Sequence, residues 1–136
     1  MSWGGCSLAR RGNKFHAVPA EWEGRRYAST AERDYRAVLA WREMAGEVRN
    51  IEEQPRVELE PGIFYKPDFQ LEEKNGSGGW RLAYHEVKGM ETERFRLICK
   101  LWRLHGKAPL RVVKRAGRRA HFCTVREIYP EGEETC

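Results

Sequence analysis

Hydrophobic residues recur at strand and helix spacings along the first third of the chain. The runs Ala20 to Trp22 and Arg25 to Ala28 flank a Glu-Gly pair, and this pattern predicts a small hairpin. Apolar residues then follow at the spacing of a helix until Gly46, where the pattern stops. Ser29 precedes this pattern and can cap the helix. We therefore expect a hairpin followed by one helix.

The middle of the chain has the composition and alternation of strands. Three runs are rich in β-branched, aromatic and alternating residues, and two segments with strong turn residues separate them. We expect these runs to form an antiparallel meander. The runs are residues 57–60, 63–71 and 80–88, and the turns are Pro61-Gly62 and residues 74–79.

The last third predicts a second helix and a closing strand. Thr92 can cap the helix, which runs to Gly106, and residues 110–114 form a short β-branched strand. Residues 121–128 are a candidate for one more strand. The resulting order of the core elements is α, β, β, β, α, β, which is an α/β fold.

Composition predicts one folded domain over residues 1–136. The chain is 40% hydrophobic and of single-domain length. Residues 1–14 are basic and poor in apolar side chains, so we expect a flexible arm, and residues 130–136 form a loose acidic tail. No membrane span or secretion signal is recognisable, which favours the cytosol. The four cysteines lack the paired spacing of a zinc site.

Positive charge is concentrated in the second half of the chain. Residues 92–126 contain eleven basic residues and one acidic residue, a net charge of +10. Such density favours a polyanionic partner, because neutralised phosphates supply most nucleic-acid affinity; a solvated basic face is the alternative. The candidate nucleic-acid contacts are Arg10, Arg11, Lys14, Arg96, Lys100, Arg103, Arg118 and Arg119.

Two carboxylates are expected to meet between the second and third strands of the meander. A turn centred near residue 76 or 77 sets Asp68 opposite residue 85 or 86, so Asp68 and Glu86 are neighbours. By strand alternation, Glu86 and Lys88 also share a face with apolar residues. Adjacent carboxylates favour a hard cation such as Mg²⁺ or Mn²⁺. Alternation places Asp68 on a more polar face, which a bulge at Pro67 can reconcile.

These residues resemble the motif of the PD-(D/E)xK nuclease superfamily. The matching elements are Pro67-Asp68, then Glu86-Val87-Lys88 after seventeen intervening residues, with Glu32 upstream on a helix. The resemblance covers about residues 13 to 115. It implies a restriction-endonuclease-like α/β fold, with a mixed central sheet flanked by helices. Size and basic charge are similar to those of archaeal-type and phage-encoded Holliday junction resolvases.

The resemblance also implies the roles of the site residues. Glu32, Asp68 and Glu86, with the Val87 carbonyl, would hold one or two Mg²⁺ ions for phosphodiester hydrolysis, and Lys88 would position the attacking water. Gln54 is carried as a possible helper. The alternatives are that Glu32 only completes the Ser29 capping box, and that Glu86 and Lys88 form a surface ion pair.

The function implied is a metal-dependent junction-resolving endodeoxyribonuclease. A nicking or restriction-type repair endonuclease would use the same residues, and a non-catalytic nucleic-acid-binding module of this fold would need only the basic residues. The sequence does not separate junctions from other DNA substrates.

The second helix has two apolar faces at 100° per residue. Phe95, Ile98, Cys99 and Trp102 lie on one side, and Leu97, Leu101 and Leu104 lie nearly opposite. One face can cover the sheet of its own domain. We expect a second copy of the chain to cover the other in a two-fold homodimer. Alternatively, residues 120–128 fold back over it.

Overall fold

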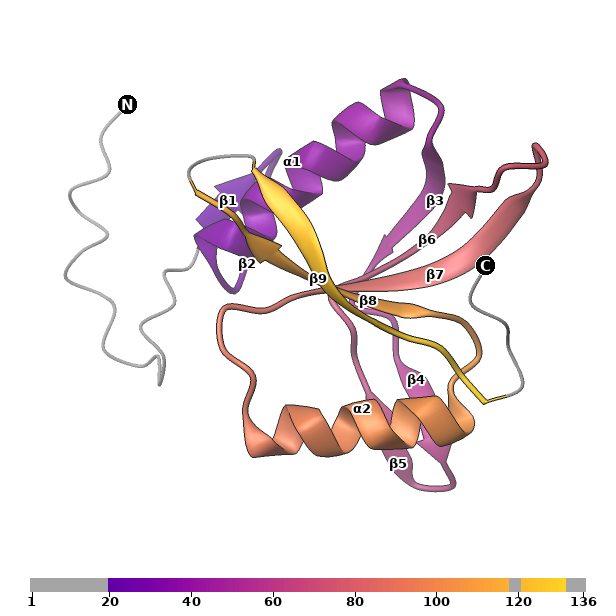
Figure 1. The fold of residues 1–136 in the computed structure, drawn as a ribbon. Coiled ribbons are helices and arrows are strands. Elements are labelled where there is room, and N and C mark those ends of the chain that lie inside the picture. The colour runs from indigo at the N-terminus through magenta and orange to yellow at the C-terminus, as the bar shows by residue number, and fades with distance from the viewer. Residues whose placement is uncertain (1–19, 118–120, 132–136) are drawn as a thin grey trace, which may run out of the picture.

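The structure is a computed structural model that describes residues 20–117 and 121–131. These described residues form two helices and nine strands, which follow one another in chain order (Figure 1). They are β1 (Ala20–Trp22), β2 (Arg25–Tyr27), α1 (Thr30–Met44), β3 (Val48–Glu53), β4 (Val57–Glu60), β5 (Ile63–Tyr65), β6 (Phe69–Lys74), β7 (Trp80–Val87), α2 (Glu93–His105), β8 (Leu110–Arg115) and β9 (Phe122–Ile128).

A five-stranded mixed sheet forms the centre of the molecule, in the order β3-β6-β7-β8-β9. Strands β7 and β8 are parallel and joined by α2, whereas the other neighbours are antiparallel. Helix α1 and the β1–β2 hairpin lie on one side of this sheet, and α2 and the β4–β5 hairpin lie on the other (Figure 1). The expected α/β fold with a mixed sheet flanked by helices is therefore confirmed.

Both helices begin and end where their sequences predict. The Ser29 hydroxyl accepts a hydrogen bond from the Glu32 N–H at 3.1 Å, and the Thr92 hydroxyl accepts one from Phe95 N–H at 3.1 Å. Helix α1 ends just before Gly46, whose φ of +80° a residue with a side chain rarely adopts. These local signals account for the bounds of both helices.

The predicted meander is wrong in its first strand. Residues 57–60 do not join the central sheet; they form β4 and pair with β5 in a separate hairpin. The first strand of the sheet is β3, which pairs with β6. Its alternation is masked by a register shift between Arg49 and Glu52, where Asn50 has a φ of 54°. Its exposed polar residues also give it no hydrophobic run to detect.

The predicted strand over residues 63–71 is two strands. The chain leaves the strand conformation at residues 66–68, between β5 and β6. Pro67 lies in this break because it has no N–H to donate to a sheet. The break, and not a bulge, separates Asp68 from the alternation of β5.

The sheet has a hydrophobic core on each face. Under α1, Tyr35 and Leu39 pack with Phe69, Leu71 and other buried residues. On the α2 side, the Trp102 ring meets Tyr84 edge to face at 5.0 Å, and its N–H donates to the Ala108 carbonyl at 2.7 Å. These two cores fix α1 and α2 against opposite faces of the same strands.

Helix α2 buries one of its two apolar faces, as its spacing predicts. Phe95, Ile98, Cys99 and Trp102 are buried, whereas Leu97 and Leu104 are 56% and 54% exposed. Residues 122–128 do not cover this second face, because they form β9 at the edge of the sheet beside β8. The alternative of a folded-back cover is therefore wrong.

Several expected features fall outside the described residues. These are the basic arm of residues 1–14, Arg118, Arg119 and residues 132–136 of the tail. Within the described ranges, neither helix has the length and apolar character needed to cross a membrane.

Candidate active site

Asp68 and Glu86 lie side by side where β6 begins and β7 ends. The register pairs Phe69 with His85, so the residue before one faces the residue after the other, as predicted. The Val87 N–H donates a hydrogen bond to Asp68 Oδ2 at 2.8 Å, and the Asp68 N–H donates one to Glu86 Oε1 at 3.2 Å. Each carboxylate is thus held by the backbone of the other strand, which fixes the pair in one geometry.

Glu32 approaches this pair from the first turn of α1. Only its backbone N–H takes part in the Ser29 cap, while the side chain is buried and accepts a hydrogen bond from the Gln54 side chain. The Glu86 charge acts on Glu32, and the Glu32 charge acts on Asp68. The cap therefore accounts for the position of the Glu32 backbone N–H. The Glu32 carboxylate instead lies with those of Asp68 and Glu86, and we call these three carboxylates the acidic cluster.

Gln54 connects two of the acidic residues. Its N–H donates to the Asp68 carbonyl at 2.9 Å, and its side chain bonds the Glu32 carboxylate. Gln54 has a φ of 50°, a left-handed conformation that costs about 1 kcal/mol or more for a residue with a side chain. The sequence indicated Gln54 only as a possible helper, and the structure places it in direct contact with Glu32.

Tyr65 is a site residue that sequence reasoning missed. It ends β5, and its hydroxyl donates a hydrogen bond to the Glu86 carboxylate. Burial, followed by the Glu86 charge, raises the pKa of Tyr65 far above its usual range, so the hydroxyl stays protonated. No sequence signal could have identified Tyr65, because its place depends on how the β4–β5 hairpin packs against the sheet.

Lys88 is the cation beside the acidic cluster. Its Nζ lies 3.4 Å from Glu86 Oε2 and 4.8 Å from the centre of the Phe95 ring. Glu86 is only 4% exposed, so this is not the solvated surface pair considered as an alternative. Lys88 stabilises a charge that burial would otherwise make costly.

The positive charge of Lys88 beside Glu86 is too little for all three carboxylates to ionise readily. Burial, and then the charge of Glu86, raises the pKa of Glu32 to about 6. The pKa of Asp68 is raised well above its usual range by burial and by the charges of Glu86 and Glu32. Burial also raises the pKa of Glu86, although Lys88 opposes the shift. A further cation would relieve this repulsion.

The donor chemistry of the cluster suits a hard divalent cation, although its present geometry is not a finished metal site. Two buried carboxylates and the half-buried Asp68 offer only oxygen ligands, which Mg²⁺ and Mn²⁺ prefer. In residues 20–117 and 121–131, however, no three His, Cys, Asp or Glu side chains are arranged to hold a metal ion. Their oxygens instead accept hydrogen bonds from backbone N–H groups, Tyr65 and Gln54. Binding by all three would exchange some of these bonds for metal contacts.

The basic residues predicted to contact nucleic acid are only partly described. Arg96, Lys100 and Arg103 lie exposed along α2, as a phosphate-contacting stripe requires. The other five candidates, Arg10, Arg11, Lys14, Arg118 and Arg119, lie outside the described ranges.

The fold and the acidic cluster define a class of mixed α/β protein with three electrostatically coupled carboxylates at one end of its sheet. A family model matches residues 12–117, and the chain belongs to that family, described as "Protein of unknown function (DUF1064)". Comparison with curated proteins and with solved structures finds no match.

Proposed function

We propose that this protein is a divalent-metal-dependent endodeoxyribonuclease similar to the PD-(D/E)xK superfamily, and that its substrate is a four-way DNA junction. The observation that carries the proposal is the pair formed by half-buried Asp68 and buried Glu86, which reciprocal backbone hydrogen bonds lock together and which Glu32 and Lys88 accompany. Buried carboxylates with raised pKa values are unfavourable for stability, so they favour a functional role.

Glu32, Asp68 and Glu86, with the Val87 carbonyl, would hold one or two Mg²⁺ ions, and Mn²⁺ would be the usual substitute. A metal bound there would supply Lewis-acid chemistry, which would polarise the scissile phosphate and lower the pKa of a nearby water. Lys88 orients the attacking water or neutralises charge on the phosphate, while Tyr65 holds the Glu86 carboxylate in place. The products carry a 5′-phosphate and a 3′-hydroxyl, as in the superfamily that the motif resembles.

DNA is the proposed polyanion because positive charge and the acidic cluster lie in one small domain. The exposed basic side chains of α2, with the basic residues of 1–14 and 118–119, would contact DNA phosphates and would not read the nucleobase sequence. We assign the reaction to the cytosol of a prokaryotic or phage-infected cell. A nicking or repair endonuclease is the second candidate, because the same carboxylates and lysine would serve it equally.

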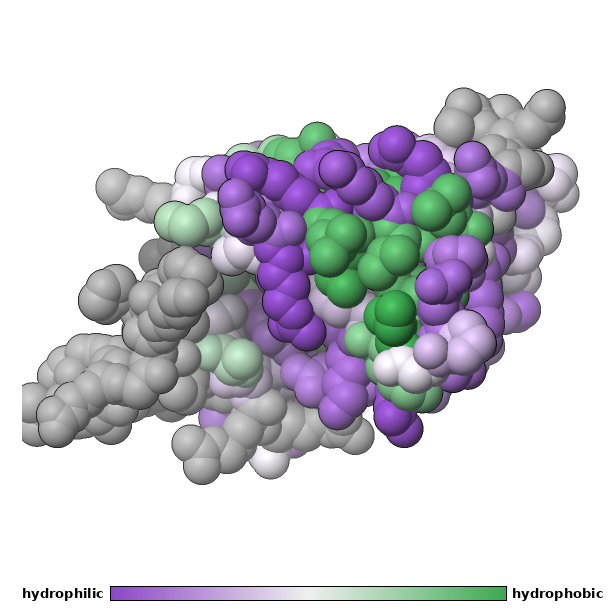
Figure 2. All heavy atoms as spheres, turned by 90° about the horizontal axis from the view of Figure 1, so that it is seen from below, coloured by the Kyte–Doolittle hydropathy of each residue, from purple (hydrophilic) through white to green (hydrophobic). Residues whose placement is uncertain are grey.

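A second copy of the chain is the proposed partner. Hydrophobic side chains gather on the face formed by α2 and the β4–β5 hairpin, within a polar border (Figure 2). Leu97 and Leu104 supply exposed apolar contacts, whereas Leu101 packs partly against its own core.

Substrate choice tests this proposal. The protein is incubated with a synthetic four-way junction, a matched duplex of the same arms and a single strand, with Mg²⁺ or with excess chelator, and products are resolved on a denaturing gel. The proposal expects paired cuts in the junction and none with chelator. Equal cleavage of duplex and junction would contradict the resolvase assignment and leave a less selective nuclease.

A further inference from the structure

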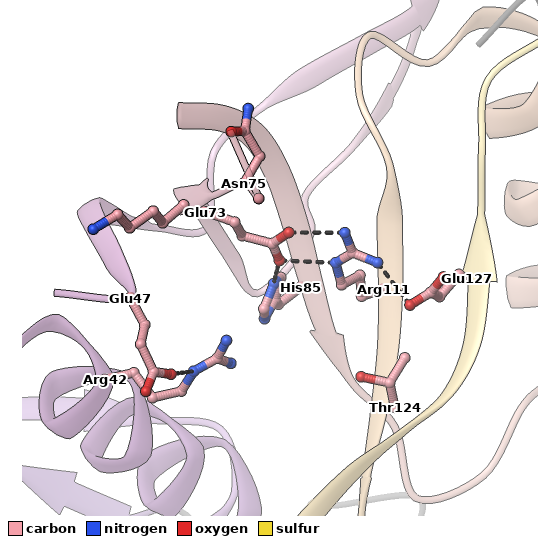
Figure 3. A pocket seen from close by; sticks show the side chains of 10 residues that line it. Arg42, Glu47, Glu73, Asn75, His85, Arg111, Thr124 and Glu127 are labelled. Carbon is pink, nitrogen blue, oxygen red and sulfur yellow. Dashed lines mark hydrogen bonds and ion pairs between the residues drawn. The ribbon is translucent and has the colours of Figure 1, made fainter. Parts of the chain in front are cut away.

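A chain of buried and part-buried hydrogen bonds lies on the sheet face that α1 covers, and Figure 3 shows its links from His85 through Glu73 to Arg111. The Tyr35 hydroxyl lies 2.6 Å from His85 Nδ1, and His85 Nε2 lies 2.7 Å from Glu73 Oε2. Arg111 donates hydrogen bonds to the same Glu73 carboxylate from Nε and Nη2, both at 2.8 Å. We call these four residues the Tyr35–Arg111 chain; it links α1 to β7, β6 and β8.

The hydrogen-bond directions along the chain follow from its charges. Burial raises the pKa of Glu73, but bonds from His85 and Arg111 outweigh burial and lower it to about 2, so this carboxylate only accepts. His85 Nε2 must then carry a proton. Burial lowers the pKa of His85, so the ring is neutral and its Nδ1 accepts from the Tyr35 hydroxyl. Every group between α1 and Arg111 has a defined partner.

The polar cavity beside the chain does not indicate a ligand site of its own. It has a volume of about 540 Å³ and is lined by charged side chains from α1, β6, β8 and β9 (Figure 3). Arg42 pairs with Glu47, and Arg111 pairs with Glu73 and Glu127. With Lys74, the lining holds three cationic and three anionic side chains, which balance. The cavity therefore offers no excess charge to a ligand. The Tyr35–Arg111 chain of hydrogen bonds is better explained by the elements that it links.

The Tyr35–Arg111 chain of hydrogen bonds links the two elements, α1 and β7, that carry Glu32 and Glu86. Tyr35 follows Glu32 by three residues, about one turn of α1, and His85 directly precedes Glu86 on β7. The Tyr35 and His85 side chains are 3% and 1% exposed. Their hydrogen bond joins α1 to β7 about one helical turn from Glu32 and one residue from Glu86, two carboxylates that repel each other.

We propose that Tyr35 and His85 are positioning residues that hold Glu32 of α1 in register with Glu86 of β7 for cation binding. This inference rests on the proposed function, because the register matters only if the carboxylates share a cation. Outer residues that orient ligands typically contribute 10-fold to 100-fold to metal affinity.

The test compares Tyr35→Phe with wild type by calorimetric titration with Mg²⁺ and by cleavage kinetics. Phenylalanine keeps the ring that packs on Phe69 and Phe122 and removes only the hydroxyl. We expect Mg²⁺ affinity to fall about tenfold, with a lower kcat and an unchanged KM for junction DNA. Arg111→Lys keeps the positive charge but cannot donate to Glu73 from two nitrogens. We expect it to weaken Mg²⁺ binding, as Tyr35→Phe does.

A control separates positioning from loss of stability. Ile98→Val removes one buried methylene from the opposite core, and its loss of stability should be similar to that from removing one hydrogen bond. It should lower thermal stability as Tyr35→Phe does and leave Mg²⁺ affinity unchanged. Equal Mg²⁺ affinity of wild type and Tyr35→Phe would overturn this inference alone. A wild type that binds no Mg²⁺ would overturn it together with the proposed function.

Discussion

Local rules place Asp68, Glu86 and Lys88 together before the structure, whereas Glu32 is expected at the site because the sequence resembles the nuclease motif. The glycine-rich turn fixes the register that makes Asp68 and Glu86 neighbours, and alternation places Lys88 beside Glu86. Tyr65 could not be identified, since only the packing of a separate hairpin brings its hydroxyl to Glu86. Sequence therefore reveals the charged residues of the site better than the neutral ones that hold them.

Glu32 should make the metal-free protein less stable at neutral than at acidic pH. Its folded-state pKa of about 6 lies above the usual 4.5, so the fold favours the protonated form. Its contribution to the free energy of unfolding is complete below pH 4.5 and is lost as the pH rises through 6. The loss is about 2 kcal/mol at pH 7.

Glu32→Gln should remove this part of the pH dependence, because glutamine stays neutral. Urea unfolding of the metal-free protein at pH 4.5 and pH 7 measures it, and the variant should gain stability relative to wild type as the pH rises. Glu43→Gln, at an exposed position of the same helix, is the control and should follow wild type. A pH dependence of Glu32→Gln equal to that of wild type would show that Glu32 is not desolvated by the cluster.

At the scale of elements, capping residues and turns predicted both helices and β7, whereas the polar edge strand was missed. Strand β3 has a register shift and mostly exposed residues, so its membership of the sheet is decided by pairing with β6. The β4–β5 hairpin was assigned to the wrong sheet because its alternation is equally compatible with either. Local patterns predict that a strand exists, and its partner depends on tertiary packing.

Helix α2 should contribute measurably to DNA affinity through its exposed bases. Replacing Arg96, Lys100 and Arg103 with alanine removes the positive charges that we propose to contact phosphates, so binding should weaken and depend less on salt. The log-log slope should fall by about 0.9 for each phosphate that the variant no longer neutralises. Fluorescence anisotropy with a labelled junction at several salt concentrations measures both effects.

Lys74→Ala is the control for this measurement, since Lys74 is an exposed base at the far end of β6. Its salt dependence should match that of wild type. A triple variant of α2 with an unchanged slope would mean that the DNA lies elsewhere on the surface.

At the scale of the whole molecule, the exposed apolar face of α2 predicts a homodimer. Leu97→Glu places a charge in the proposed contact and should shift the protein toward monomer, because a buried unpaired charge is costly. Val125→Glu, at a similarly exposed apolar position on β9, should leave the oligomeric state unchanged. Light scattering after size-exclusion chromatography at micromolar concentration gives the mass of each, and a monomeric wild type would refute the dimer.

Cleavage should follow the oligomeric state. Two symmetric cuts in one junction need two active sites, so Leu97→Glu should lose paired cutting and keep single nicking. Paired cutting by a monomeric variant would separate junction resolution from dimerisation.

The most direct test of the acidic cluster as a metal-dependent active site is junction cleavage by Asp68→Asn at increasing Mg²⁺. Asparagine keeps the size of the side chain and an oxygen that can accept the Val87 N–H bond, but it removes the charge that a cation needs. We expect wild type to cut only when Mg²⁺ is present, and the variant to bind the junction with nearly wild-type affinity and not cut it. Wild-type rates from Asp68→Asn, or cleavage by wild type in excess chelator, would contradict metal-dependent hydrolysis at this cluster.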